Sequence, residues 1–297
     1  MKRNVLRSLI ALGCFTGVAA GATYLTTLNI AVLNPKGPIG VEEQHLILIA
    51  AALSLVVVVP VLGLLIAFAV RYREGNTKSR YAPNLRSSRK VEAVWWALPT
   101  ALIGVLSVIT WTSSHDLDPY APLKSGNAAI RVQVVAMDWK WLFLYPDQGI
   151  ASVNALVIPV DTPVHFLITA DGPMNTLWIP QLSGQIYAMP GMQTQLNIQA
   201  SDEGTYSGLS ANLSGKGFSG MRFKTTVVSN PAFQKWIGER RASAAVLDRT
   251  SYAHLQAPSL DVPPAYFRLA DQEIFAFIID QYMTVPSSPS TKGGSSP

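Results

Sequence analysis

The residues best able to bind a transition metal are few and widely spaced. The chain of 297 residues has one cysteine, Cys14, and four histidines, His45, His115, His165 and His254. One cysteine allows neither a disulfide within the chain nor a site that needs two thiolates, which excludes zinc ribbons, iron–sulfur clusters and paired-cysteine copper centres. The histidines lack the short spacing of a metal site, so we interpret all four as structural. Nucleophile elbows and phosphate-binding loops are also absent from the sequence.

One carboxylate lies where it could transfer protons. Glu92 stands at the beginning of an apolar run, three residues after Arg89. An acidic side chain near the plane of a membrane is a candidate for proton transfer. The alternative is an ordinary interfacial carboxylate that balances Arg89 and Lys90, and these residues alone leave both interpretations open.

Two apolar segments are long enough to cross a membrane as helices. Residues 46–70 and residues 93–114 contain no charged side chain. A helix needs about 20 such residues to cross the hydrocarbon core. Only 14% of the chain is charged, whereas a soluble domain carries about 25% charged residues. We therefore predict a transmembrane hairpin over residues 45–115, embedded in a lipid bilayer.

The net charge of +5 does not indicate a nucleic-acid-binding protein. The loop between the two apolar runs, residues 71–90, holds seven basic residues and one acidic residue. A DNA-binding surface would instead spread its basic residues over a folded domain. By the positive-inside rule this loop lies in the cytoplasm. The N-terminal stretch and everything after the hairpin then lie in the periplasm of a bacterium, anchored in its inner membrane.

The N-terminus has the features of an export signal. Residues 1–22 combine a basic start, a mostly apolar stretch and a cleavage motif of small residues, AGA at 20–22. Residues 23–44 then form a periplasmic N-terminal stretch. The sequence around Cys14 also resembles a weak lipidation motif, but we favour a cysteine inside a signal segment. Mass spectrometry of the mature N-terminus distinguishes the two.

The exported part divides into a β-domain and a helical extension. Residues 127–229 contain short alternating segments such as 130–136, separated by glycine and proline, which predicts a β-sandwich or small barrel. Residues 230–285 form a C-terminal extension with helices predicted over 230–246 and 271–283. The serine- and proline-rich tail, residues 286–297, is predicted to be disordered.

Several motifs in a fixed order resemble subunit II of haem–copper respiratory oxidases, and most closely that of the cytochrome bo-type ubiquinol oxidases, the branch that lacks the copper centre. They are NPKG (34–37), KVEAVWW (90–96), MDWKW (137–141), YPDQGIA (145–151), MNTLWIP (174–180), QIYAMPGMQT (185–194), GTY (204–206) and SGKGFSGM (214–221). The resemblance implies a cupredoxin fold for the β-domain, attached to the membrane hairpin.

The resemblance also implies that a copper site has been lost. Related cytochrome c oxidases hold two coppers here through two histidines, two cysteines, a methionine and a glutamate carbonyl. The corresponding residues are Asn175 and Phe218 for the histidines, Ser210 and Ser214 for the cysteines, Asn212 for the glutamate and Met221 for the methionine, which alone is retained. Serine hydroxyls cannot replace the soft thiolates that copper needs. We therefore expect this chain to bind no cofactor.

By the same resemblance, the chain belongs to a proton-pumping enzyme that oxidises ubiquinol and reduces oxygen to water. Haems and the remaining copper are expected in subunit I, which oxidises ubiquinol, and subunits III and IV complete the set of partners. Glu92 matches a glutamate at the entrance of a proton-uptake channel. Trp139 and Trp141 match aromatic residues near electron entry, and we expect them to dock against subunit I.

Two alternatives differ in testable ways. A copper-containing subunit of cytochrome c oxidase would show copper absorption in the near infrared. A stand-alone, membrane-anchored binding protein of cupredoxin fold would purify without a haem-bearing partner. The replaced ligands disfavour the first, and the long series of oxidase motifs disfavours the second.

Overall fold

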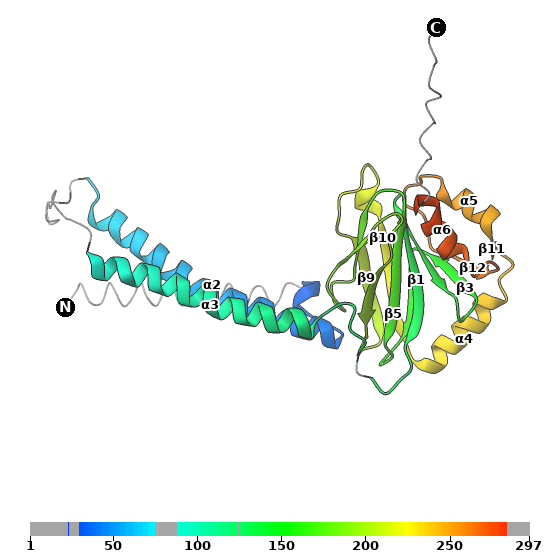
Figure 1. The fold of residues 1–297 in the computed structure, drawn as a ribbon, viewed down its shortest axis with the longest axis horizontal. Helices are drawn as coiled ribbons and strands as arrows, with labels where there is room; N and C mark the ends of the chain where they lie inside the picture. Colours follow the sequence, from blue (N-terminus) through cyan, green and yellow to red (C-terminus); the bar gives the residue numbers. More distant parts are fainter. Residues whose placement is uncertain (1–22, 24–29, 75, 77–87, 124, 284–297) are drawn as a thin grey trace, which may run out of the picture. The chain divides into compact units, whose positions relative to one another are not determined.

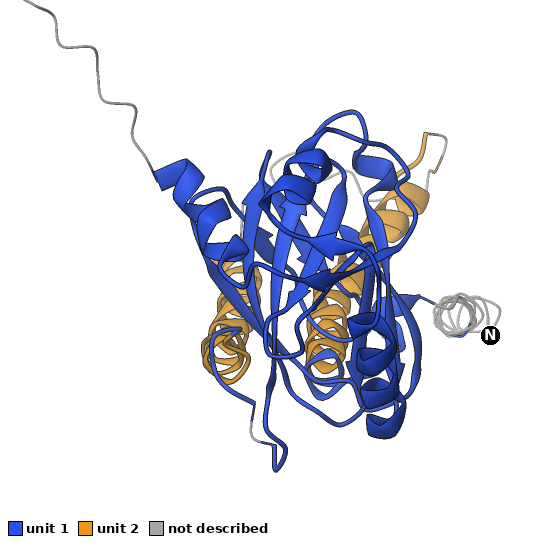
Figure 2. Ribbon diagram, turned by 90° about the vertical axis from the view of Figure 1, so that its right-hand side faces the viewer, with its two compact units in different colours: residues 1–41, 119–297 blue, residues 42–118 orange. Residues whose placement is uncertain are grey.

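The computed structural model describes residues 23, 30–74, 76, 88–123 and 125–283. The predicted signal segment, Cys14 and the predicted disordered tail lie outside these residues. The chain divides into two compact units, Met1–Val41 together with Pro119–Pro297, and Glu42–Asp118 (Figure 2).

The second unit is formed by two long apolar helices. They are α2 (Pro38–Arg71), whose first residues belong to the other unit, and α3 (Arg89–Asp116). Each has one proline in its interior, Pro60 in α2 and Pro99 in α3. Serine and threonine hydroxyls donate to the carbonyl four residues earlier, as Thr100 does to Trp96 at 2.8 Å. Both helices are long and apolar enough to cross a membrane. Their apolar side chains are exposed, with Trp111 at 70%, as expected of surfaces that face lipid.

The other unit is built on two β-sheets. The first has the order β11-β12-β3-β2-β1-β5-β8, and the second has the order β4-β10-β9-β6-β7. The strands are β1 (Ile130–Met137), β2 (Lys140–Tyr145), β3 (Ile150–Val153), β4 (Ala155–Pro159), β5 (Val164–Asp171), β6 (Asn175–Trp178), β7 (Ile186–Ala188), β8 (Thr194–Ile198), β9 (Gly204–Ser210), β10 (Arg222–Val228), β11 (Val246–Leu247) and β12 (Ala265–Leu269). This arrangement confirms the predicted β-sandwich.

A hydrophobic core fills the space between the sheets. On β10 the residues alternate between exposed and buried, so that Phe223 and Val227 point inward. Phe223 meets the rings of Trp141 and Phe143 of β2 at 5.8 and 5.0 Å between ring centroids. Such tilted and edge-on contacts favour a defined packing of large aromatic side chains. The two sheets thus pack against each other through aromatic rings that point into the core.

Much of the C-terminal extension covers the other face of the first sheet, whereas Phe233 and Ile237 near its beginning pack into the first core. It contains α4 (Asn230–Arg241), α5 (Arg249–Gln256) and α6 (Ile274–Met283). Figure 1 shows α5 and α6 on the side of β1 and β3 that faces away from β9 and β10. A second core forms there from residues of the sheet and of the extension: Val135, Met137, Leu142, Leu144, Ala151, Val153, Leu247, Tyr252, Leu269, Ile274, Phe275 and Ile278. The first sheet is therefore buried on both faces.

The extension differs from the sequence prediction in two respects. The helix predicted over 230–246 ends at Arg241, and the helix predicted from 271 begins at Ile274. Between them lie the strands β11 and β12, which the sequence analysis did not expect. β12 pairs antiparallel with β3, and β11 pairs parallel with β12. Backbone pairing with a sheet edge thus extends the first sheet into the extension.

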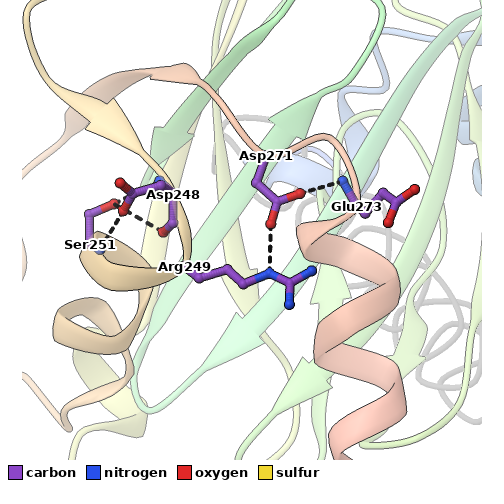
Figure 3. A network of polar contacts seen from close by, with 5 residues as sticks. All are labelled: Asp248, Arg249, Ser251, Asp271 and Glu273. Carbon is purple, nitrogen blue, oxygen red and sulfur yellow. Dashed lines mark hydrogen bonds and ion pairs between the residues drawn. The ribbon is translucent and has the colours of Figure 1, made fainter.

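Polar contacts connect the two outer helices of the extension. Arg249 of α5 donates to Asp271, just before α6, at 2.8 Å, and Asp271 also accepts from the backbone amide of Glu273 at 2.9 Å (Figure 3). Asp248 and Ser251 form a reciprocal capping box at the beginning of α5. These contacts satisfy backbone amides at helix N-termini that have no partner within the helix.

The segment before α2 is built into the β-unit. The Lys36 amide donates to the Gln181 carbonyl at 2.7 Å, and the Lys36 ammonium group pairs with Asp202 at 2.9 Å. A Cβ atom added to Gly37 would lie 2.2 Å from the carbonyl oxygen of Gln199, so only glycine allows this approach. The segment that precedes the membrane helices is thus held by main-chain contacts.

The segment after α3 is hydrogen-bonded to Asn197 of β8. The Asn197 side chain donates to the carbonyls of Pro119 and Ala121, both at 3.1 Å. Its oxygen contacts the His165 Nδ1 atom at 2.8 Å. Because the amide nitrogen already donates, this oxygen accepts and His165 carries its proton on Nδ1. His165 is therefore structural, as the sequence analysis expected.

Candidate functional site

The residues at the predicted former copper positions lie on adjoining strands and one loop. Asn175 begins β6 and Ser210 ends β9, and these two strands pair in the second sheet. Both residues are almost completely buried. The Ser210 hydroxyl donates to the Asn175 side-chain oxygen at 2.9 Å and accepts from the Thr176 amide at 3.4 Å. The two side chains therefore satisfy each other inside the domain.

The loop after β9 brings the remaining positions back to the same place. The Asn212 side chain donates to the Met174 carbonyl at 2.9 Å. Phe218 begins the short 3₁₀ helix η2 (Phe218–Gly220), and the Met221 amide donates to its carbonyl at 3.1 Å. The Ser210 amide in turn donates to the Met221 carbonyl at 3.2 Å. Backbone hydrogen bonds thus connect Ser210, Met221 and Phe218.

Ser214 differs from the other polar residues of this loop. Its hydroxyl oxygen is buried and has no hydrogen-bond partner among the described residues. Its carbonyl accepts a hydrogen bond from the Trp139 indole nitrogen at 3.3 Å. Ser214 therefore contributes to the site through its backbone, which contacts Trp139.

This set of side chains does not fit a binuclear copper centre. Such a centre needs thiolates that bridge the metals, and the site offers neutral amides, hydroxyls and the thioether of the buried Met221. The Asn175 and Ser210 oxygens are already hydrogen-bonded to each other. Within the described residues, no three or more His, Cys, Asp or Glu side chains come together as a possible metal site. Among the described residues, the arrangement can therefore support the loop but supplies no thiolate or imidazole ligand for copper.

The two tryptophans of the MDWKW motif have different environments. Trp139 is half-buried and has a left-handed backbone with φ of 60°. Trp141 is 0% exposed and packs against Phe223 in the first core. A side chain that is buried inside its own domain cannot bind another subunit. The prediction that Trp141 docks against subunit I is therefore wrong, and Trp139 remains the candidate.

Glu92 lies in the first turn of α3, and its amide donates to the Ser88 carbonyl at 2.9 Å. The residue is exposed. Of the loop that precedes this turn, residues 77–87 lie outside the described part of the chain. The described contacts of Glu92 neither support nor oppose a role in proton uptake.

Two charged residues of structural importance were not singled out from the sequence. Lys140 is buried, and desolvation lowers the pKa of its ammonium group although the nearby Asp138 opposes that shift. Asp171 at the end of β5 accepts hydrogen bonds from Tyr252, from Gln256 at 2.9 Å and from Tyr282 at 2.7 Å. The sequence did offer a signal for Lys140, because a lysine between two tryptophans at the beginning of an apolar segment is unusual. Asp171 had none, because its partners are distant in sequence.

Burial and the same carboxylate perturb the tyrosines at this point. Desolvation, together with the hydrogen bond to Asp171, raises the pKa of Tyr282 to about 12. The pKa of Tyr252 is raised further by the same causes. Both phenols therefore remain neutral donors at neutral pH, and they attach α5 and α6 to the end of β5.

Comparison with protein families first defines the class. Residues 146–228 match the family described as "Cytochrome C oxidase subunit II, periplasmic domain", and residues 241–284 match "COX Aromatic Rich Motif". The β-domain is thus the cupredoxin-like domain of an oxidase subunit II, as predicted. Together with the two apolar helices, the match describes a membrane-anchored protein with a periplasmic C-terminal domain.

Comparison with individual proteins defines the family within this class. The chain is 47% identical to cytochrome bo(3) ubiquinol oxidase subunit 2 of Pseudomonas aeruginosa over 263 residues, which cover 89% of this chain and 80% of that protein. It is 43% identical to ubiquinol oxidase subunit 2 of Acetobacter aceti over 284 residues, 95% of this chain and 91% of that protein. The chain belongs to the family of ubiquinol oxidase subunit 2.

A solved structure shows a weaker likeness. The periplasmic domain of subunit II of cytochrome oxidase from Bradyrhizobium japonicum is 22% identical, with a TM-score of 0.37, and covers 40% of this chain and 96% of that chain. We base no argument on this likeness.

Proposed function

We propose that this chain is the copper-free subunit II of a proton-pumping ubiquinol oxidase, which oxidises ubiquinol and reduces oxygen to water. The observation that carries the proposal is the hydrogen bond between Ser210 and Asn175, two positions where copper-binding relatives have a cysteine and a histidine. Neutral oxygens that are already hydrogen-bonded to each other are poor ligands for copper, which needs soft thiolates to form a binuclear centre. Electrons then reach the oxygen-reducing centre without passing through this chain.

The absence of thiolates at these positions determines the electron donor. A soluble haem protein outside the membrane needs a relay in subunit II, and soft ligands are required to build that relay from copper. A quinol dissolves in the bilayer and reaches the large subunit directly. In this proposal subunit I holds the haems and the remaining copper, and subunits III and IV complete the complex in the bacterial inner membrane.

We further propose two supporting roles. Glu92 gathers cytoplasmic protons at the beginning of α3, since it lies in the first turn of a membrane-spanning helix. Trp139 contributes to docking against subunit I, since it is half-buried at the edge of the former ligand loop. Neither role requires this chain to hold a redox centre.

The donor preference of the purified complex tests the function. The complex is isolated in detergent through a tag on this chain, and oxygen consumption is measured with ubiquinol and with reduced cytochrome c. We expect a haem-containing partner to co-purify and ubiquinol to be oxidised, with no oxidation of cytochrome c above the haem-free background. Oxidation of cytochrome c at a comparable rate would favour the copper-relay alternative. Purification without haem would favour the stand-alone binding protein.

A further inference from the structure

The loop of residues 211–221 depends on contacts from elsewhere for its shape. It connects β9 to β10 and includes η2 and three glycines, Gly215, Gly217 and Gly220. Gly215 has φ of 115°, a conformation open mainly to glycine. Three glycines in eleven residues make the unfolded loop flexible, so ordering it has a large entropic cost.

A segment of the C-terminal extension lies directly against this loop. A Cβ atom added to Gly217 would lie 2.4 Å from the Trp139 ring and 2.5 Å from the Leu260 side chain. One added to Gly220 would lie 2.6 Å from an Asp261 carboxylate oxygen. Gly217 is thus enclosed between Trp139 and Leu260. We name residues 257–262 the strap.

Two buried polar residues hold the ends of the strap. The Lys140 ammonium group donates to the Ala257 carbonyl at 2.8 Å and to the Ser259 hydroxyl at 2.5 Å. The Asn154 side chain donates to the Val262 carbonyl at 2.8 Å. Lys140 is 2% exposed and Asn154 is 7% exposed. A buried donor that loses its acceptor has a substantial free-energy cost, so these contacts oppose detachment of the strap.

We propose that the strap is a conformational clamp that holds the loop 211–221 closed against the β-domain. The Leu260 and Trp139 side chains together occupy the space next to Gly217 that a larger side chain would need. Opening of the loop then requires the strap to detach or Leu260 to leave its contact. The C-terminal extension thereby controls the order of a loop that precedes it in the chain by some forty residues. This role is independent of whether ubiquinol is the substrate.

Trypsin cleavage after Lys216 measures the opening of this loop. Lys216 is exposed within the loop, but a protease needs the surrounding backbone to open before it can cleave. The test uses the full-length protein in detergent with the partners that co-purify. In the Leu260→Ala protein we expect cleavage at Lys216 to accelerate about tenfold, because proteolysis follows the population of the open form. Leu260→Met should restore slow cleavage.

Two controls separate clamp loss from general unfolding. Leu213→Ala removes a leucine that is 77% exposed in the same loop, and it should leave cleavage at Lys216 unchanged. Lys235 in α4 should stay uncut in every variant. If cleavage at Lys235 also rises in Leu260→Ala, Ser259→Ala decides, since it removes one acceptor of the Lys140 anchor without disturbing either core. If cleavage at Lys235 stays low, Leu260→Ala itself decides. Unchanged cleavage at Lys216 in whichever of the two variants decides would overturn the proposal.

Discussion

At the scale of single residues, most of the positions predicted to have lost copper ligands have hydrogen-bond partners within the protein. Ser210 and Asn175 form a buried hydrogen bond, and Asn212 binds the Met174 carbonyl. The order of the motifs predicts these positions from the sequence. Their hydrogen bonds could not be predicted, because they depend on how β6 and β9 approach each other. The burial of Trp141 was missed for the same reason, since its ring meets Phe223 across the sandwich.

Glu92 gives the residue-scale prediction. In the assembled complex, Glu92→Ala should lower ubiquinol-driven oxygen consumption by about tenfold. This is less than the roughly 100-fold or more that an acid–base group at a reacting centre contributes, because Glu92 would deliver protons and would not act at that centre. The measurement is turnover per haem at neutral pH. Glu74→Ala, which removes a carboxylate just after α2, should leave turnover unchanged. Unchanged turnover in a fully assembled Glu92→Ala complex would contradict the proposed proton-uptake role.

At the scale of elements, the sequence predicted strands best where one short alternating segment forms one strand. The segment 130–136 was predicted and lies within β1, Ile130–Met137. β12 was missed because its identity depends on pairing with β3, more than one hundred residues earlier in the chain. Lys140 was missed as an anchor for the same reason, since its acceptor Ala257 lies 117 residues away. Long-range partners leave no local periodicity to detect.

The contact between α5 and α6 predicts a pH dependence. The hydrogen bond from Arg249 is the main cause that lowers the pKa of Asp271 below its ordinary value of 3.8. A carboxyl group whose pKa is lowered by folding stabilises the folded state when ionised, and this stability is lost as the pH falls through the lowered value. Asp271→Asn should therefore speed hydrogen exchange of α6 amides at pH 7. The difference from the wild type should shrink as the pH falls below 3.8 and vanish once the pH is below the lowered pKa of Asp271.

A matched carboxylate provides the control for that measurement. Asp280 lies on an exposed position of α6 itself, and Asp280→Asn should leave the exchange of α6 unchanged at neutral pH. A difference between Asp271→Asn and the wild type that persists unchanged into acid would show that the ionised carboxylate is not the cause.

At the scale of the whole molecule, the chain combines a pair of membrane-capable helices with a domain that has two cores. The first sheet lies between the second sheet and the C-terminal extension, which explains why its strands are buried on both faces. The segments before α2 and after α3 are both bound within this domain. The molecule is thus stabilised as a scaffold by apolar burial and backbone pairing, and its loop of residues 211–221 is in contact with other parts of the same domain.

The optical and magnetic spectra of the purified complex test the central claim most directly. The complex, isolated through a tag on this chain and supplied with copper, is oxidised, and its near-infrared absorption and electron paramagnetic resonance are recorded. We predict no signal of a binuclear copper centre, because Ser210 and Asn175 satisfy each other where ligands would be needed. A binuclear copper signal that is present in the wild type and lost in Met221→Leu would contradict the account.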